Sequence, residues 1–271
     1  MRSTVNGRRG CVGGLVAAVA LAAAIRASAD GPATSGGDAA NPGAALAGEY
    51  RHSAAAHAGK VRRSVATISE RAAGLGIAWQ EDEGNLFGGI GLRLDNVFGA
   101  AYTEALNGAF RGSGVLAYRI QDGTLAGLRL PAGSGQIVEE TLRGPPALEG
   151  RYDIVRSVDA GGATYHSGHV EIEHRGDTYQ MIWYTPERSF EGVGLRIGDV
   201  LVAGYAKGFA PGLVAYCIDG DVLTGVSTYG HSGTIGADRL LRAGTGSADT
   251  AQPSDYCRAA IDQWNPSLRG K

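Results

Sequence analysis

The chain has 271 residues and a formal charge of −2, and 44 of its residues are glycine. That glycine share is more than twice the ordinary value of about 7%. Because the sequence has no collagen period and no low-complexity tract, the glycines indicate many short strands joined by tight turns. The mild negative charge and the lack of any Lys/Arg block argue against nucleic acid as a partner.

Residues 1–29 have the pattern of a signal peptide. Arg2, Arg8 and Arg9 precede an apolar run from Val12 to Ile25, and Ala27-Ser28-Ala29 is a small-residue cleavage site. The run is shorter than the ~20 residues of a membrane-spanning helix, and no later segment is apolar enough to span a bilayer. We therefore expect an exported protein, periplasmic or secreted and not membrane-spanning, with export by the general or the twin-arginine route left open.

Cleavage after Ala29 would remove four of the 25 Lys and Arg residues and none of the 27 Asp and Glu residues, which leaves a mature charge of −6. Two cysteines remain, Cys217 and Cys257, and an even count in an oxidising compartment favours a disulfide between them. If Val214 and Tyr216 face inward along their strand, Cys217 faces outward, where the C-terminal tail could reach it. Two free thiols are the alternative.

One phrase occurs twice in the chain. "LFGGIGLRLDNVFGAAY" begins at Leu86 and "SFEGVGLRIGDVLVAGY" at Ser189, and residues 87–102 match residues 190–205 at eight of sixteen positions without a gap. The matching pairs are Phe87/Phe190, Gly89/Gly192, Gly91/Gly194, Leu92/Leu195, Arg93/Arg196, Val97/Val200, Ala100/Ala203 and Tyr102/Tyr205.

The similarity continues downstream, where "GVLAYRIQDGTLAG" from Gly114 parallels "GLVAYCIDGDVLTG" from Gly212. Each copy then closes in Leu-Arg, at Leu142-Arg143 and at Leu241-Arg242. The chain is therefore an internal duplication, with its joint near Pro145-Pro146, where two prolines cannot continue a strand ladder.

Each copy divides into about eight short strands separated by turn residues that tolerate positive φ, such as Gly198-Asp199 and Asp219-Gly220-Asp221. In the second copy the predicted strands are residues 151–155, 169–174, 178–184, 190–197, 200–205, 212–218, 222–228 and 236–241. Closing such a meander into a barrel removes its exposed edges. We predict an all-β chain with two tandem antiparallel up-and-down barrels of the calycin or lipocalin type, and a short C-terminal helix over Asp255–Trp264 with Ser254 as its N-cap.

This interpretation gives the chain five parts. They are a signal peptide (1–29), a flexible linker (30–45), a first barrel repeat (46–144), a second barrel repeat (147–243), and a linker with the C-terminal tail (244–271).

The second copy carries a series of short phrases: "GRY" at Gly150, "SGHVEI" at Ser167, "GDTYQMIW" at Gly176, "FEGVG" at Phe190, "GDVLVAGY" at Gly198 and "DGDVLTG" at Asp219. In this series it resembles a family of small secreted bacterial proteins labelled "fibronectin-binding protein". The resemblance covers residues 148–242 well and 46–143 loosely. It implies a calycin-like barrel and, through the label, adhesion to a host matrix protein.

Aromatic residues recur at matching positions of the two copies. They either form a cup for an apolar or aromatic ligand, with tyrosine hydroxyls orienting it, or make up an ordinary core, because eight strands enclose little space. The residues are Tyr50, Trp79, Phe87, Tyr102 and Tyr118 in the first copy and Tyr152, Trp183, Phe190, Tyr205 and Tyr216 in the second.

Other motifs favour structural roles. His166, His169 and His174 cannot converge on zinc, because strand alternation places His169 beside Glu171 and Glu173 on one face and His174 on the other. "YGHSGT" at Tyr229 lacks the final glycine and the helix of a nucleophile elbow around Ser232. The acidic run Glu81-Asp82-Glu83 predicts a solvated turn rather than a calcium site. "GGIGLR" at Gly88 is not a phosphate loop, since no Lys-Ser/Thr follows it.

We therefore expect an exported, non-catalytic binding or envelope-associated module without metal or cofactor. Its partner would be a small apolar molecule or an extracellular or envelope protein. A ligand carrier with an aromatic cup, an enzyme with a barrel-mouth site in the second repeat and a purely structural pair are the alternatives. The enzyme is disfavoured because no paired carboxylate, His dyad or nucleophile is seen to recur in both copies; Tyr216 and His231 are its least poor candidates.

Overall fold

A computed structural model describes residues 46–55, 61–81, 84–105, 112–245 and 252–268. The predicted signal peptide and the linker over residues 30–45 lie outside this part of the chain. The described residues form sixteen strands and a short C-terminal helix, and the strands close into two antiparallel eight-stranded barrels. The predicted fold class is confirmed.

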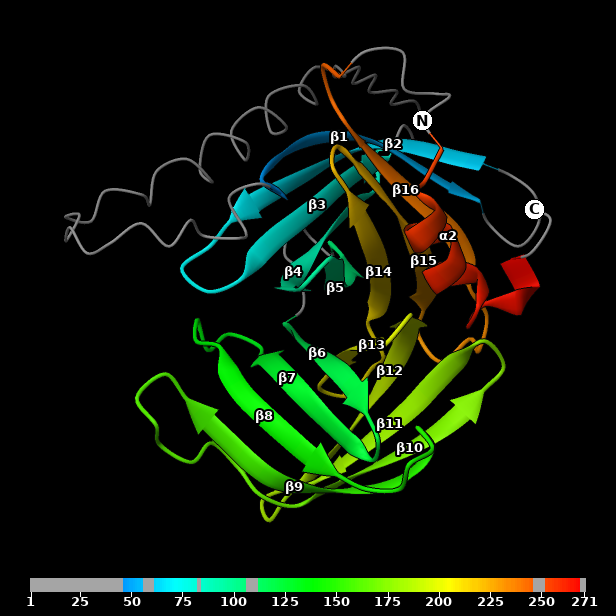
Figure 1. Ribbon diagram of the computed structural model, residues 1–271. Helices are drawn as coiled ribbons and strands as arrows, with labels where there is room; N and C mark the ends of the chain where they lie inside the picture. The colour runs from blue at the N-terminus through cyan, green and yellow to red at the C-terminus, as the bar shows by residue number, and fades with distance from the viewer. Residues whose placement is uncertain (1–45, 56–60, 82–83, 106–111, 246–251, 269–271) are drawn as a thin grey trace, which may run out of the picture. The chain divides into compact units, whose positions relative to one another are not determined.

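One barrel is built from a single stretch of chain, and we call it the continuous barrel (Figure 1). Each of its strands pairs with the next, and β13 returns to pair with β6, from Val200 opposite Arg119 to Ala206 opposite Ser113. Its strands are β6 (Ser113–Gln121), β7 (Thr124–Leu130), β8 (Val138–Arg143), β9 (Gly150–Asp159), β10 (His169–Arg175), β11 (Thr178–Tyr184), β12 (Ser189–Ile197) and β13 (Val200–Ala206).

The other barrel combines the two ends of the described chain, and we call it the split barrel. In Figure 1 its blue and cyan strands pair with gold and orange ones, because β5 pairs with β14 and β1 pairs with β16. Its strands are β1 (Gly48–Ala55), β2 (Val61–Glu70), β3 (Leu75–Glu81), β4 (Leu86–Leu94), β5 (Val97–Glu104), β14 (Gly212–Asp219), β15 (Val222–Tyr229) and β16 (Gly236–Arg242).

The barrels therefore do not coincide with residues 46–144 and 147–243, and this part of the predicted organisation is corrected. The last three strands of each copy close the barrel begun by the other copy. Both exchanged seams have the same local structure: Gly114 lies opposite Tyr205, and Gly212 lies opposite Tyr102. In each pair a Cβ on the glycine would come within 2.2 or 2.3 Å of the tyrosine ring. Because the two seams have the same local pattern, that pattern does not specify which barrel each edge closes.

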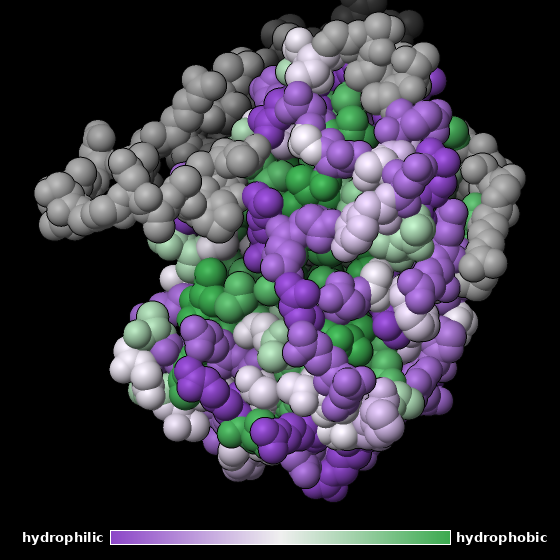
Figure 2. Space-filling view, viewed as in Figure 1, coloured by the Kyte–Doolittle hydropathy of each residue, from purple (hydrophilic) through white to green (hydrophobic). Residues whose placement is uncertain are grey.

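Each barrel encloses its own apolar cluster, and a third cluster lies between the two. Glycine permits close packing there: a Cβ at Gly99 of β5 would lie 2.2 Å from the side chain of Val202 of β13. On the face shown in Figure 2, hydrophilic residues cover most of the surface and hydrophobic ones show in gaps between them. Burial of apolar area in these three clusters is the main stabilising contribution to the fold.

The C-terminal tail is attached to the split barrel by the predicted disulfide. Cys217 of β14 bonds Cys257 of helix α2 (Asp255–Asp262), across 40 residues of sequence. Ser254 caps the helix by accepting a hydrogen bond from the Cys257 N–H at 3.3 Å, as predicted. As strand alternation indicated, Tyr216 lies in the barrel interior while Cys217 lies in the cluster outside it.

Candidate functional site

The split barrel contains a cavity of about 590 Å³, which we call the cup. Trp79, Phe87 and Tyr102 form an aromatic wall along it. The ring centroids of Trp79 and Tyr102 lie 4.9 Å apart, and those of Phe87 and Tyr102 lie 6.1 Å apart. Period-two alternation of β3, β4 and β5 brings these three side chains to the inner face of the barrel.

A polar network lies at one side of the cup. His52 Nε2 lies 3.0 Å from Asp238 Oδ1, and His52 Nδ1 lies 2.6 Å from Ser64 Oγ. The Tyr216 hydroxyl donates to the same Asp238 oxygen at 2.6 Å. Both ring nitrogens of His52 therefore have a hydrogen-bond partner in this network.

The buried carboxylate of Asp238, whose side chain is 3% exposed, affects the tyrosines around it. Burial raises the pKa of Tyr216 well above its ordinary value, and the charge and hydrogen bond of Asp238 raise it further. The pKa of Tyr102 is also raised, mainly by burial and then by the charge of Asp238. Both phenols are therefore neutral donors at physiological pH.

Charged side chains occur at the outer part of the cup. Arg62 and Glu81 form an ion pair at 3.5 Å, and Glu104 is a further exposed carboxylate there. Surface pairs of this kind contribute about 1 kcal/mol or less to stability. These charges therefore matter mainly for the electrostatic potential at the opening of the cup, where there are two carboxylates and one guanidinium.

The continuous barrel carries the same polar framework. Tyr118 lies opposite Gly127, which lies opposite Glu140. Tyr216 lies opposite Gly225, which lies opposite Asp238 in the split barrel. In both barrels the tyrosine hydroxyl donates to the carboxylate two strands away, and a Cβ on the intervening glycine would come within 1.9 Å of a backbone carbonyl oxygen of the strand that carries the tyrosine. A buried Tyr–carboxylate pair is thus a duplicated feature.

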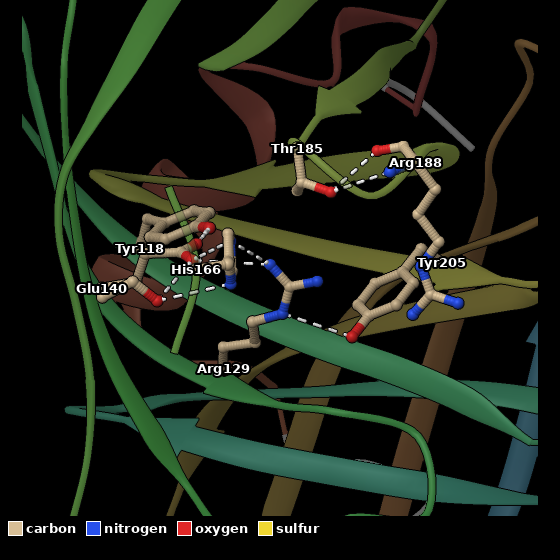
Figure 3. Close-up of polar contacts among 8 residues, drawn as sticks. Tyr118, Arg129, Glu140, His166, Thr185, Arg188 and Tyr205 are labelled. Atoms are coloured by element: carbon tan, nitrogen blue, oxygen red, sulfur yellow. Dashed lines mark hydrogen bonds and ion pairs between the residues drawn. The ribbon is translucent and has the colours of Figure 1, made fainter. Parts of the chain in front are cut away.

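In the continuous barrel the space beside this pair is filled by Arg129 (Figure 3). Its Nη1 lies 3.4 Å from Glu140 Oε1, and its Nε donates to the Tyr205 hydroxyl at 3.2 Å. His166, from the connection between β9 and β10, places Nε2 2.9 Å from Glu140 Oε1. Ser157 also donates to Glu140, at 3.3 Å.

This cluster is fully desolvated, with side chains of Arg129 and Glu140 that are 3% and 0% exposed. Burial alone raises the pKa of Glu140, but the hydrogen bonds from His166 and Tyr118 and the charges of Arg129 and His166 outweigh it and lower the pKa. Burial likewise opposes the charge on Arg129, but its contacts with Tyr205 and Glu140 raise its pKa overall. The pair is therefore ionised inside the barrel.

The predicted aromatic residues divide between the two roles that the sequence left open. Tyr50 and Tyr152 are core residues whose hydroxyls donate to backbone carbonyls of Leu46 and Ala147. Trp183 is fully buried, and Phe190 and Tyr205 pack against Arg129. Tyr118 and Tyr216 bind the buried carboxylates, and only Trp79, Phe87 and Tyr102 of the set line the cup.

The histidines are arranged as strand alternation predicts. His169, Glu171 and Glu173 share the outer face of β10, opposite buried Val170 and Ile172, while the side chain of His166, 7% exposed, lies beside Glu140 in the continuous barrel. Among the described residues no group of three or more His, Cys, Asp or Glu side chains is placed to hold a metal ion.

Two further motifs lie near the cup. Ser232 contacts Thr228 and Thr234 in a turn of the cup lining. Glu81 also lines the cup, whereas residues 82–83 of its acidic run lie outside the described part of the chain.

Sequence reasoning missed the polar residues of both barrels, namely His52, Asp238, Glu140 and Arg129. A signal for the carboxylates was present. In the last three strands of each copy, the strand registers match residues that are 98 positions apart in the sequence, which makes Glu140 equivalent to Asp238. Alignment on the closing Leu-Arg uses an offset of 99 and separates them.

Comparison with family models, curated proteins and solved structures gave no significant match. Within the described residues, no helix is both long and apolar enough to cross a membrane.

Proposed function

We propose that the protein is an exported, non-catalytic binding protein that holds a small molecule in the cup of the split barrel. The observation that carries this proposal is the cavity of about 590 Å³ with an aromatic wall and a buried polar network. Cavities of this size, largely apolar with a few convergent polar groups, are the usual sites of small ligands. The signal-peptide pattern of residues 1–29 and the Cys217–Cys257 disulfide support export.

The difference between the duplicated barrels supports assigning the ligand to one of them. Position 129 in the continuous barrel is an arginine that occupies the interior, whereas the equivalent position in the split barrel is Ser227. Glu140 is likewise replaced by the shorter Asp238. Both differences remove side-chain volume from the split barrel, so one barrel is filled by its own side chains and the other is left open.

Fluorine NMR of protein labelled with 5-fluorotryptophan tests this function, because the chain has three tryptophans and one of them, Trp79, lines the cup. A fragment set of neutral, cationic and anionic aromatic molecules should contain compounds that move the Trp79 resonance saturably and leave Trp183 unchanged. Ser227→Met, which puts a larger side chain into the cup, should weaken or abolish these shifts. Ser189→Met, the same change at an exposed position of the continuous barrel, should not. If no fragment moves the Trp79 resonance, the cup is not a ligand site.

A second candidate is hydrolysis, because Ser64, His52 and Asp238 form a continuous hydrogen-bonded chain in the cup. In that mechanism Ser64 Oγ would attack an ester carbonyl and pass its proton to His52. Against this mechanism, Ser157, His166 and Glu140 make similar contacts in the continuous barrel. This repetition indicates that the serine and histidine provide hydrogen-bond partners for a buried carboxylate. Ser64 also lies within β2, where its N–H belongs to a strand ladder.

A fluorophosphonate probe, which labels activated serines covalently, separates the two candidates. The binding function predicts that peptide mapping finds no adduct on Ser64. Labelling of Ser64 that is lost in Ser64→Ala and kept in Ser232→Ala, a change at another serine of the cup, would establish the hydrolase instead.

A further inference from the structure

The duplication provides the same site in both barrels. In the continuous barrel the site is filled, and the group that fills it shows what the conserved tyrosine, carboxylate and aromatic rings can hold. In the continuous barrel that group is the guanidinium of Arg129. Its Cζ lies 4.7 Å from the Tyr205 ring centroid and 5.0 Å from that of Phe190. These distances are within the range of cation–π attraction. Together with Glu140 and the Tyr205 hydroxyl, the two rings surround a buried planar cation.

Each of these groups has an equivalent in the split barrel. Strand registers relate Glu140 to Asp238, Tyr205 to Tyr102 and Phe190 to Phe87. All three equivalents line the cup. The cation itself has no equivalent, since Ser227 replaces Arg129 and carries no charge. The split barrel thus retains the carboxylate, the phenol and the aromatic faces, with a cavity in place of the guanidinium.

The charge balance of the cup also favours a cation. Inside the cup, the contacts of Asp238 with His52 and with the Tyr216 hydroxyl both go to Oδ1. At the opening, Glu104 and Glu81 outnumber Arg62, which is already paired with Glu81. Ionic hydrogen bonds to a desolvated carboxylate are about twice as strong as neutral ones.

We propose that the cup of the split barrel binds a small organic cation of the guanidinium or amidinium class, with a flat apolar part against Trp79. The cationic group takes the place that Arg129 fills in the continuous barrel, beside Asp238 and the Tyr102 hydroxyl and over the rings of Tyr102 and Phe87. This inference rests on the proposed function, because it names the ligand class of the same cup.

Three probes of nearly the same shape test the charge preference in the unmodified protein: benzamidine is a cation, benzamide is neutral and benzoate is an anion. Isothermal titration calorimetry and the Trp79 fluorine resonance should both report saturable binding of benzamidine. Benzamide should bind about tenfold or more weakly, because it lacks the ionic contact. Benzoate should show no binding.

Two variants place the binding at the proposed position. Asp238→Asn keeps the side-chain size and should weaken benzamidine at least about tenfold while changing benzamide little. Ser227→Arg restores the arginine of the other barrel and should abolish benzamidine binding. Glu171→Gln, which removes an exposed carboxylate from the continuous barrel, should leave benzamidine affinity unchanged. A thermal unfolding scan of each variant separates loss of binding from loss of fold.

The outcomes distinguish this inference from the function on which it rests. If benzamide or benzoate binds as tightly as benzamidine at Trp79, the cation inference is wrong and the ligand-binding function stands. If neither these probes nor any other fragment moves Trp79, both fail. If benzamidine binds but Asp238→Asn is without effect, the cation lies elsewhere and the inference also fails. The three-probe comparison uses the unmodified protein, so its result does not depend on the folding of any variant.

Discussion

Replacing Trp183 by alanine should lower the free energy of unfolding by about 3–5 kcal/mol, the usual cost of truncating a buried aromatic side chain. Trp183 is fully buried in the continuous barrel. Its ring stacks on Phe190 at 5.2 Å and lies 5.7 Å from Tyr205. Because Arg129 and its neighbours already occupy the adjacent space, the surrounding side chains have little freedom to collapse into the void.

Urea unfolding followed by far-ultraviolet circular dichroism measures this change, and the duplication supplies a matched control. Trp79 is the equivalent residue of the split barrel, and it borders the open cup. Trp79→Ala should therefore cost less than Trp183→Ala, because it enlarges an existing cavity that solvent can enter. Equal losses for the two variants, or a loss below about 1 kcal/mol for Trp183→Ala, would contradict the assignment of one filled and one open barrel.

Breaking the buried pair in the continuous barrel should have a comparable effect. Arg129→Met leaves the carboxylate of Glu140 buried without its guanidinium, and removing one partner of such a pair costs about 3–5 kcal/mol. Glu140→Gln should also destabilise the protein. The double variant should lose less than the sum of the two single losses, because no unpaired charge is left inside.

The pH dependence of stability gives a second test of this pair. In the folded protein the pKa of Glu140 is lowered, so the folded state binds its proton more weakly than the unfolded state. The stabilising contribution is therefore complete above the unfolded pKa of about 4.3 and is lost as the pH falls through the lower folded value.

In Arg129→Met the guanidinium no longer opposes the effect of burial, so the pKa of Glu140 should rise. The stability difference between wild type and Arg129→Met should then shrink between about pH 7 and about pH 4, as Glu140 takes up a proton in the variant. Thermal unfolding across this range measures the difference. A difference that is independent of pH would show that the effect of Arg129 is one of packing alone.

Local patterns in the sequence predicted the strands closely, because each depends on neighbouring residues. Thr178–Tyr184 forms β11 with the predicted bounds, and the strand predicted over residues 190–197 begins one residue earlier. Gly198 and Gly220 have φ values of 58° in the predicted turns. Outward-facing Cys217 could likewise be identified from alternation alone, and its bond to Cys257 is confirmed.

The candidate site was less accessible to sequence reasoning. The polar network of the cup joins His52, Ser64 and Asp238, and His52 and Asp238 are 186 residues apart. No local pattern relates such residues until the barrel closes β16 against β1. The recurrence of Glu140 and Asp238 was hidden for a simpler reason, a shift of one residue in the alignment of the two copies.

The sequence by itself determined the duplication, the all-β fold, the strands with their turns and the cysteine that faces outward. These features follow from the alternation of inward- and outward-facing side chains along a strand, from the positions of the glycines and from the residue preferences of tight turns. Only the tertiary structure decided how the strands are shared between the barrels and which barrel is open. Both exchanged seams place a glycine opposite an equivalent tyrosine, so this local pattern does not specify which edge closes which barrel. Whether a barrel is filled depends on side chains such as Arg129 and Ser227. Both lie on strands, β7 and β15, that pair with their neighbours in sequence, but the groups they meet across the interior, such as Tyr205 for Arg129, belong to strands far away in the chain.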